Sequence, residues 1–162
     1  MVLGISPGMT QNPETRTETS LPDFDLDGFL PYRMSVAADR LSTGLARRYR
    51  EEFGLSVAEW RVLVHLVHSG EVSVRDIGQR VNLEKSKASR AASRLESDGL
   101  IRKDINATDR RLLVLTLTEE GQALMAKLLP LAIAYQQKLE RLIGARLDAL
   151  NEAIDIILRE DP

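Results

Sequence analysis

Apolar residues from Leu30 onward recur at steps of three and four positions, a spacing that predicts a helix with one buried stripe. Gly54 is expected to end this helix, because glycine readily adopts the left-handed conformation found after helix C-termini. The stripe consists of Leu30, Met34, Ala37, Ala38, Leu41, Leu45 and Tyr49.

A second helix is predicted to follow directly. Ser56 and Glu59 form a Ser-x-x-Glu capping box, and the helix should run to about Ser69, before Gly70. Its sequence, VAEWRVLVHLVHS, is apolar nearly all round. A helix without a broad polar face is usually buried, so this one should lie at the centre of the fold.

Two further helices are predicted, separated by a three-residue turn at 81–83. Ser73 and Asp76 repeat the capping pattern, which places a short helix before about Arg80. A fourth helix is expected over about 84–98, stopped by glycine. One of its faces is expected to pack on the second and third helices; its residues are Ala88, Ala92 and Leu95.

Residues 100–117 predict a β-hairpin. A polar turn, 104–111, separates a short segment that includes two basic residues from the apolar run 112–117. Short extended runs around a polar tip are typical of hairpins. A short helix, a turn, a basic helix and a hairpin with arginines at its tip follow the order of a winged helix-turn-helix.

Two more helices are expected after the hairpin. Thr118 caps a long helix from Glu119 to about Ile143, and Pro130 inside it should kink the helix or mark a break. A last helix follows. The long helix has apolar residues at nearly heptad spacing: Leu124, Leu128, Leu131, Tyr135, Leu139 and Leu142. The apolar residues of the last helix are Leu147, Leu150, Ile154, Ile157 and Leu158.

The composition excludes several classes of protein. The 162 residues are 43% hydrophobic and 28% charged, as in an ordinary globular protein. The absence of cysteine excludes disulfides, thiolate metal sites and thiol-based redox sensing. No apolar run approaches the about 20 residues of a bilayer span, and no secretory signal is visible. A cytoplasmic protein with no membrane partner is therefore expected.

The charge distribution is more informative than the net charge of −2. Lys85, Lys87, Arg90 and Arg94 fall close together on the fourth helix, with no acidic residue between them. Basic residues at this spacing form a local anion-binding face. The alternative is an ordinary solvated helix face.

The basic helix suits the major groove of DNA. Its small hydroxyl side chains allow a close approach to base edges, and Arg90 can contact guanine through two hydrogen bonds. Arg110 should enter a minor groove, held in position by Asp109. Ser73, Arg75 and Arg94 are expected to contact backbone phosphates. The full set of candidate DNA-binding residues is Ser73, Arg75, Lys85, Ser86, Lys87, Ser89, Arg90, Ser93, Arg94, Asp109, Arg110 and Arg111.

The chain resembles the MarR family of bacterial transcriptional regulators from about Leu30 to its end. The resemblance is carried by SVRDIGQRV (73–81), LEKSKASR (83–90), RLESDGLIR (94–102), DRR (109–111) and LTLTEEG (115–121). It implies homodimers of winged-helix lobes joined by the first and last helices, most of them repressors released by small, often aromatic, ligands. Two features depart from the family pattern. Glu84 replaces the usual Ser or Asp N-cap, so the helix start should be poorly capped. Asn-Ala-Thr (106–108) replaces a commoner Asp-Pro turn.

The predicted fold class is mainly α with a small β-hairpin wing, a winged helix-turn-helix lobe plus a helical dimerisation stem. The expected parts are a disordered tail (1–20), an arm and first dimerisation helix (21–54), the DNA-binding lobe (55–118) and C-terminal dimerisation helices (119–162). A two-fold dimer would present two basic helices to a palindromic double-stranded operator. The alternative is that the stem helices fold back on their own lobe.

The ligand is less well specified by the sequence. In the family, the pocket lies between the stem helices and the DNA-binding lobe. Segment 21–66 is similar to the branch that senses hydroxycinnamoyl-CoA and related aromatic acyl-CoA thioesters, whose phosphates would suit arginine forks. The candidate ligand residues are Tyr32, Arg33, Arg40, Arg47, Arg48 and Trp60. The alternatives are a solvated arginine stripe and a tryptophan that only packs in the core.

Other functions are less well supported. His65 and His68 have metal-compatible spacing, but no third ligand is evident, so no metal or cofactor is expected. No phosphate-binding loop or nucleophile with a histidine and an acid partner is found, so the chain is not expected to be an enzyme. The remaining alternatives are an activator, a sensor of free phenolic acids, and a helical ligand-binding or scaffold protein that does not bind DNA.

Overall fold

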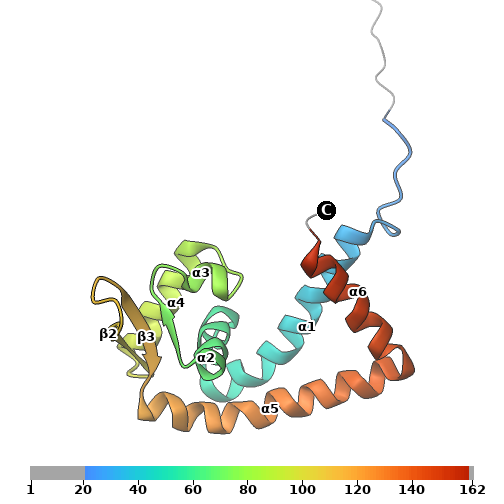
Figure 1. Ribbon diagram of the computed structural model, residues 1–162. Helices are drawn as coiled ribbons and strands as arrows, with labels where there is room; N and C mark the ends of the chain where they lie inside the picture. Colours follow the sequence, from blue (N-terminus) through green and yellow to red (C-terminus); the bar gives the residue numbers. More distant parts are fainter. Residues whose placement is uncertain (1–20, 161–162) are drawn as a thin grey trace, which may run out of the picture.

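A computed structural model describes residues 21–160, and it places a small sheet at one end of a mainly helical molecule (Figure 1). The predicted disordered tail, 1–20, lies outside the described residues. The helices are α1 (Leu30–Phe53), α2 (Val57–Ser69), α3 (Ile77–Arg80), α4 (Lys85–Ser97), α5 (Glu119–Ile143) and α6 (Leu147–Arg159), and the strands are β1 (Glu71–Ser73), β2 (Ile101–Ile105) and β3 (Leu113–Leu117). A short 3-10 turn, Gly144–Arg146, joins α5 to α6. The predicted mainly α fold with a small β wing is confirmed.

The helix ends agree with the capping residues in the sequence. The Ser56 hydroxyl accepts a hydrogen bond from the Glu59 backbone N–H at 3.2 Å, and the Glu59 carboxylate accepts one from the Ser56 N–H at 2.7 Å. Gly54 follows α1 with φ of 67°, a left-handed conformation that glycine adopts without steric cost. Thr118 caps α5 by accepting a hydrogen bond from the Gly121 N–H at 3.0 Å.

Helix α2 lies at the centre of the core, as its apolar sequence predicted. Val62, Leu63 and Leu66 have almost no exposed surface. They pack in one cluster with side chains from α1, α4, the sheet and the first half of α5. Gly121, Met125 and Leu128 are buried, so the core of the lobe extends into α5.

The sheet has three antiparallel strands in the order β1-β3-β2, rather than the two of a simple hairpin. Strand β1 pairs Val72 with Leu115 of β3. This strand includes Ser73, so the expectation that Ser73 and Asp76 cap the third helix is wrong. The Ser73 hydroxyl instead accepts a hydrogen bond from the Arg75 N–H at 3.1 Å, and α3 begins only at Ile77. Pairing with a distant strand outweighs a local capping pattern here.

Helices α1, α5 and α6 form an open triangle beside the lobe (Figure 1). Helix α5 continues through Pro130, so the alternative of a break there is wrong. The Tyr135 hydroxyl donates a hydrogen bond to the Leu41 carbonyl at 3.1 Å, and Gly44 leaves the space that this tyrosine occupies. Helix α6 has no buried residue. Within residues 21–160, no helix is both long and apolar enough to cross a lipid bilayer.

Candidate nucleic-acid interface and ligand cavity

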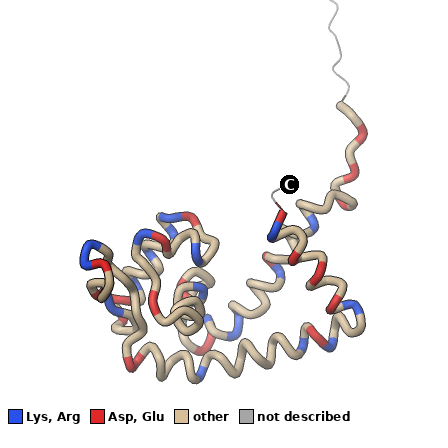
Figure 2. Tube along the Cα trace, in the orientation of Figure 1, with Lys and Arg blue, Asp and Glu red and all other residues tan. Residues whose placement is uncertain are grey.

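Helix α4 buries one face and exposes the opposite one. Its buried face, Ala88, Ala91, Ala92 and Leu95, packs on the core, so the side chains on the other side point away from the protein. Figure 2 shows basic segments in the α3–α4 region and at the wing tip. The exposed candidate residues of α4 are Lys85, Ser86, Lys87, Ser89, Arg90, Ser93 and Arg94.

The first turn of α4 is weakly capped, as expected from Glu84. The Glu84 side chain makes no cap hydrogen bond to the helix backbone. Its carboxylate instead accepts a hydrogen bond from the Ser86 hydroxyl at 2.6 Å. The Arg90 Nε donates to the Ser86 carbonyl at 3.3 Å, which directs the guanidinium along the exposed face of the helix.

Arg94 differs from the other basic residues because it is tied to α2. Its Nε lies 3.3 Å from the Glu59 carboxylate, which is 4% exposed, and 3.8 Å from that of Asp98. The Arg94 side chain remains 65% exposed. A phosphate contact by Arg94 stays a prediction, and the structure adds a second role, that of fixing α4 to α2.

The wing tip is organised by Asn106 and Asp109. The Asn106 side chain accepts hydrogen bonds from the Thr108 and Asp109 N–H groups at 3.0 and 2.8 Å. Its amide donates to the Glu71 carboxylate at 3.0 Å. This asparagine turn replaces the Asp-Pro turn that the sequence lacks.

The expected contact between Asp109 and Arg110 is not formed. The Asp109 carboxylate instead accepts from the backbone N–H of Arg111 at 3.0 Å and from its Nε at 3.2 Å. The reason is local, because an aspartate in a turn commonly binds the backbone two residues later. Arg110 and Arg111 are both exposed at the wing tip.

Of the remaining predicted positions, Ser73 ends β1 and Arg75 lies between β1 and α3. Arg75 is exposed and Ser73 is half-buried.

The wing strands also contact α4, because Lys103 of β2 forms an ion pair with Glu96. Hydrogen bonds from Arg102 and Thr116 hold the pKa of Asp104 below its usual value. These contacts join the wing strands to each other and to α4.

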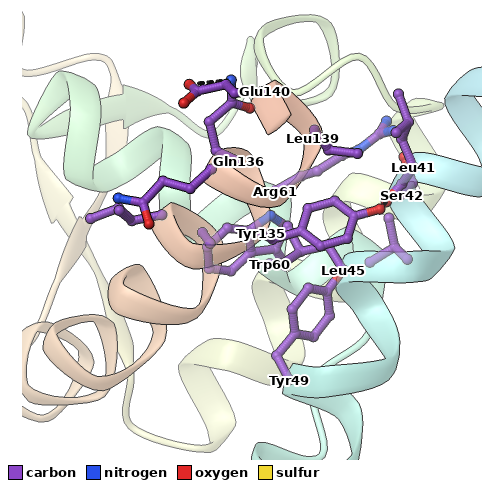
Figure 3. Close-up of a pocket in the computed structure, with 14 residues that line it drawn as sticks. Leu41, Ser42, Leu45, Tyr49, Trp60, Arg61, Tyr135, Gln136, Leu139 and Glu140 are labelled. Carbon is purple, nitrogen blue, oxygen red and sulfur yellow. Dashed lines mark hydrogen bonds between the residues drawn. The ribbon is translucent and has the colours of Figure 1, made fainter. Parts of the chain in front are cut away.

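A cavity of about 690 Å³ lies between α1, α2 and α5 (Figure 3). Three aromatic side chains, Tyr49, Trp60 and Tyr135, line it. The Tyr49 and Trp60 rings stack with centroids 5.3 Å apart. Burial raises the pKa of Tyr49, and the charges of Arg50 and Arg61 partly oppose that rise. Arg61 lines the cavity, so its positive charge acts near these aromatic walls.

The structure does not bring the predicted ligand residues together. Trp60 lines the cavity, whereas Tyr32, Arg33 and Arg40 line a separate recess of about 420 Å³ with Asp27. Arg47 and Arg48 are exposed and line neither. The cavity residues that sequence reasoning did not propose as ligand contacts include Tyr49, Arg61 and Tyr135. The helical periodicity places Tyr49 and Tyr135 on apolar helix stripes and gives Arg61 no role, although its position next to Trp60 was an available signal.

The two histidines line a different recess, beside β1 and α3. His65 and His68 share it with Asp76 and Arg80. Among the residues that the structure describes, no group of three or more His, Cys, Asp or Glu side chains is placed to hold a metal ion.

Comparisons with known proteins agree with the geometry. The family model described as MarR family matches residues 53–112. The repressor MdtR of Bacillus subtilis is 37% identical over 71 residues, which is 44% of this chain and 46% of MdtR, so the match spans about half of that relative.

Solved structures extend the similarity to most of the chain. A MarR family transcriptional regulator from Silicibacter pomeroyi has a TM-score of 0.71 and 27% identity, covering 83% of this chain and 90% of its own. NadR, solved in complex with 4-hydroxyphenylacetate, has a TM-score of 0.72 and covers 88% of this chain and 100% of its own, but its 19% identity supports the fold alone. Over residues 53–112 the chain is similar to the MarR family, and its winged helix-turn-helix fold and the relatives above agree with that similarity.

Proposed function

We propose that the protein binds a palindromic DNA operator as a homodimer, with α4 in the major groove and Arg110 of the wing in an adjacent minor groove. The observation that carries this proposal is the exposed face of α4. It combines basic groups with small hydroxyl side chains, which permit close contact with base edges. The relatives that the chain resembles are named as transcriptional regulators, which supports a role in DNA binding.

The apolar faces of the stem support dimerisation. Helix α6 buries no residue, and Leu142 and Leu158 are 78% and 77% exposed. The first half of α1 also leaves Leu30 and Leu41 exposed. A second copy related by a two-fold axis would cover these surfaces and place two recognition helices about 34 Å apart, one turn of DNA.

The proposed regulation is repression that a small aromatic acid relieves. The cavity supports it, because aromatic walls and one cation, Arg61, among its described lining residues suit an aromatic ring with one negative charge. MdtR, a relative over part of the chain, is named as a repressor, and NadR, which shares the fold, was solved in complex with 4-hydroxyphenylacetate.

An aromatic acyl-CoA thioester is the second candidate effector. The recess lined by Tyr32, Arg33 and Arg40 offers two guanidinium groups, which phosphates would require. The free acid is favoured because those arginines do not line the aromatic cavity. In either case the ligand must bind more tightly to the conformation that does not fit the operator than to the conformation that does. A coupling free energy of about 2.7 kcal/mol gives a hundredfold loss of operator affinity.

Selection of bound fragments from genomic DNA, followed by binding assays over increasing salt, tests DNA recognition. A steep linear fall of log affinity with log salt is expected, because phosphate contacts release counterions. Failure to enrich any fragment would favour the ligand-binding or scaffold alternative. Adding 4-hydroxyphenylacetate or its CoA thioester to the complex tests the effector, and reporter expression in a deletion strain distinguishes a repressor from an activator.

A further inference from the structure

We propose that Arg61 couples the cavity to the DNA-reading helix: its guanidinium binds the carboxylate of an anionic ligand in place of the backbone carbonyl of Asn82. Arg61 lines the cavity between α1, α2 and α5, and its Nη1 donates a hydrogen bond to that carbonyl at 3.0 Å. One side chain therefore contacts both the cavity and the turn that precedes α4. This inference rests on the proposed function and deepens it.

The turn that Arg61 holds has an uncommon conformation. Asn82 has φ of 50°, and asparagine tolerates this left-handed region better than most residues but still at some cost. Asn82 lies three residues before Lys85, where α4 begins. The hydrogen bond from Arg61 thus stabilises the backbone that sets the direction of α4.

The rest of that turn offers little freedom. Gly78 is buried, and a β-carbon added there would lie 3.1 Å from the Leu83 carbonyl and 3.3 Å from the Lys85 Cα. Glu84 provides no side-chain cap for α4. Because close packing converts a local change into a displacement of the neighbouring element, loss of the Arg61 contact should shift the N-terminal end of α4.

A carboxylate is a stronger partner for Arg61 than a backbone carbonyl. Arg61 is charged in both contacts, but a carboxylate adds a second, opposite charge and can accept two parallel hydrogen bonds from the guanidinium, whereas the backbone carbonyl is a neutral acceptor. Among the described residues that line the cavity, Arg61 is the one basic side chain, and the one acidic side chain, Glu140, accepts a hydrogen bond from Gln136 at 3.1 Å. An anionic ligand seated against Trp60 would therefore turn to Arg61.

Binding is tested on the full chain through the fluorescence of Trp60, the single tryptophan of the sequence. The probes are 4-hydroxyphenylacetate and its neutral amide. The wild type should bind the acid about tenfold more tightly than the amide, and Arg61→Met should lose this preference. Arg61→Lys keeps the positive charge and should retain part of the preference for the acid. Arg50→Gln is the matched control, because Arg50 also acts on Tyr49 but does not line the cavity.

Coupling is tested by operator affinity, measured by fluorescence anisotropy on the tightest fragment from the genomic selection. Without ligand, Arg61→Met should bind about tenfold more weakly than the wild type, because the Asn82 carbonyl loses its charged donor. The acid should weaken the wild-type complex and leave Arg61→Met unaffected. The Arg50→Gln variant should respond as the wild type does.

The outcomes separate the two proposals. If no DNA fragment is enriched, the proposed function is wrong, and the fluorescence titration alone decides the ligand role of Arg61. If wild-type protein binds DNA but binds acid and amide equally, or neither, the inference is overturned. The inference is also overturned if the acid releases the Arg61→Met variant from the operator as readily as it releases the wild type. If Arg61→Met does not unfold cooperatively, the variant is not properly folded. The binding of acid and amide to the wild type and to Arg61→Lys then decides the result.

Discussion

At the scale of single residues, the basic side chains of α4 are not equivalent. Arg90 points along the exposed face and is fixed through its Nε to the Ser86 carbonyl. Arg94 is directed toward the buried carboxylate of Glu59. Because a base contact needs a free guanidinium on the outward face, Arg90 is expected to read sequence, whereas Arg94 mainly positions the helix.

Replacing Arg90 with alanine should weaken binding to the selected operator by about 1–3 kcal/mol and relax the preference at one base pair in each half-site. Competition binding with operators mutated at single positions measures both effects. Lys127→Ala is the control, because Lys127 is exposed on α5, away from α4. If the Arg90→Ala protein binds with unchanged affinity and base preference, Arg90 does not contribute to sequence recognition.

The Glu59–Arg94 pair should contribute a modest coupling energy to folding. Glu59 is buried but Arg94 is largely exposed, so water screens the pair and the expected coupling is about 1 kcal/mol. Urea unfolding of Glu59→Gln, Arg94→Gln and the double variant measures it. Additive effects of the two substitutions would show that the pair does not stabilise the attachment of α4 to α2.

At the scale of elements, the wing is joined to the stem by one tight connection. The Thr118 hydroxyl donates to the Gly99 carbonyl at 2.6 Å and accepts from the Gly121 N–H, so it links the end of α4 to the start of α5. Gly121 lies directly against the backbone carbonyl of Leu100. The relative placement of wing and stem thus depends on the absence of a side chain at this position.

Gly121→Ala should lower the free energy of unfolding by about 1–3 kcal/mol, because a β-carbon would overlap the Leu100 carbonyl and backbone atoms cannot move aside freely. Urea unfolding followed by circular dichroism gives the value. The neighbouring exposed position supplies the control, Gln122→Ala, which should change stability by less than about 0.5 kcal/mol. Equal effects of the two substitutions would show that the close approach does not constrain the fold.

At the scale of the whole molecule, the apolar surface of the stem is larger than one chain covers. Leu150, Ile157 and Leu158 on α6 are exposed, as is Leu142 near the end of α5. Such surfaces are typical of an interface. Helix α6 and the end of α5 lie away from the compact lobe (Figure 1), so a partner that covers them would leave the α4 face free for DNA.

Combining Leu150→Asp with Ile157→Asp should dissociate the proposed dimer, since both charges would be buried between apolar surfaces. Sedimentation velocity is expected to show the wild type as a dimer and this variant as a folded monomer with strongly reduced operator affinity. The polar position Glu152→Gln on the same helix serves as the control. A wild-type monomer, or a variant that remains dimeric, would place the interface elsewhere or exclude it.

Sequence alone determined the features that depend on neighbours within a few positions. The capping box at Ser56, the glycine after α1 and the weak cap at Glu84 all agree with the structure. The exposed face of α4 was also predictable, because helical periodicity places Ala88 and Leu95 opposite the polar residues. Each of these features involves contacts that the local sequence specifies.

Only the tertiary structure decided the features made by residues far apart in the chain. Strand β1 forms because Val72 pairs with Leu115, although its three residues alone carry a weak signal. The cavity depends on Trp60 of α2 and Tyr135 of α5, which are far apart in the sequence and line it together. Tyr135 also donates a hydrogen bond to the Leu41 carbonyl of α1. Arg61 acquires its contact with Asn82 in the same way. Long-range packing chooses such partners, because many apolar side chains satisfy the same periodicity while only one arrangement fills the core.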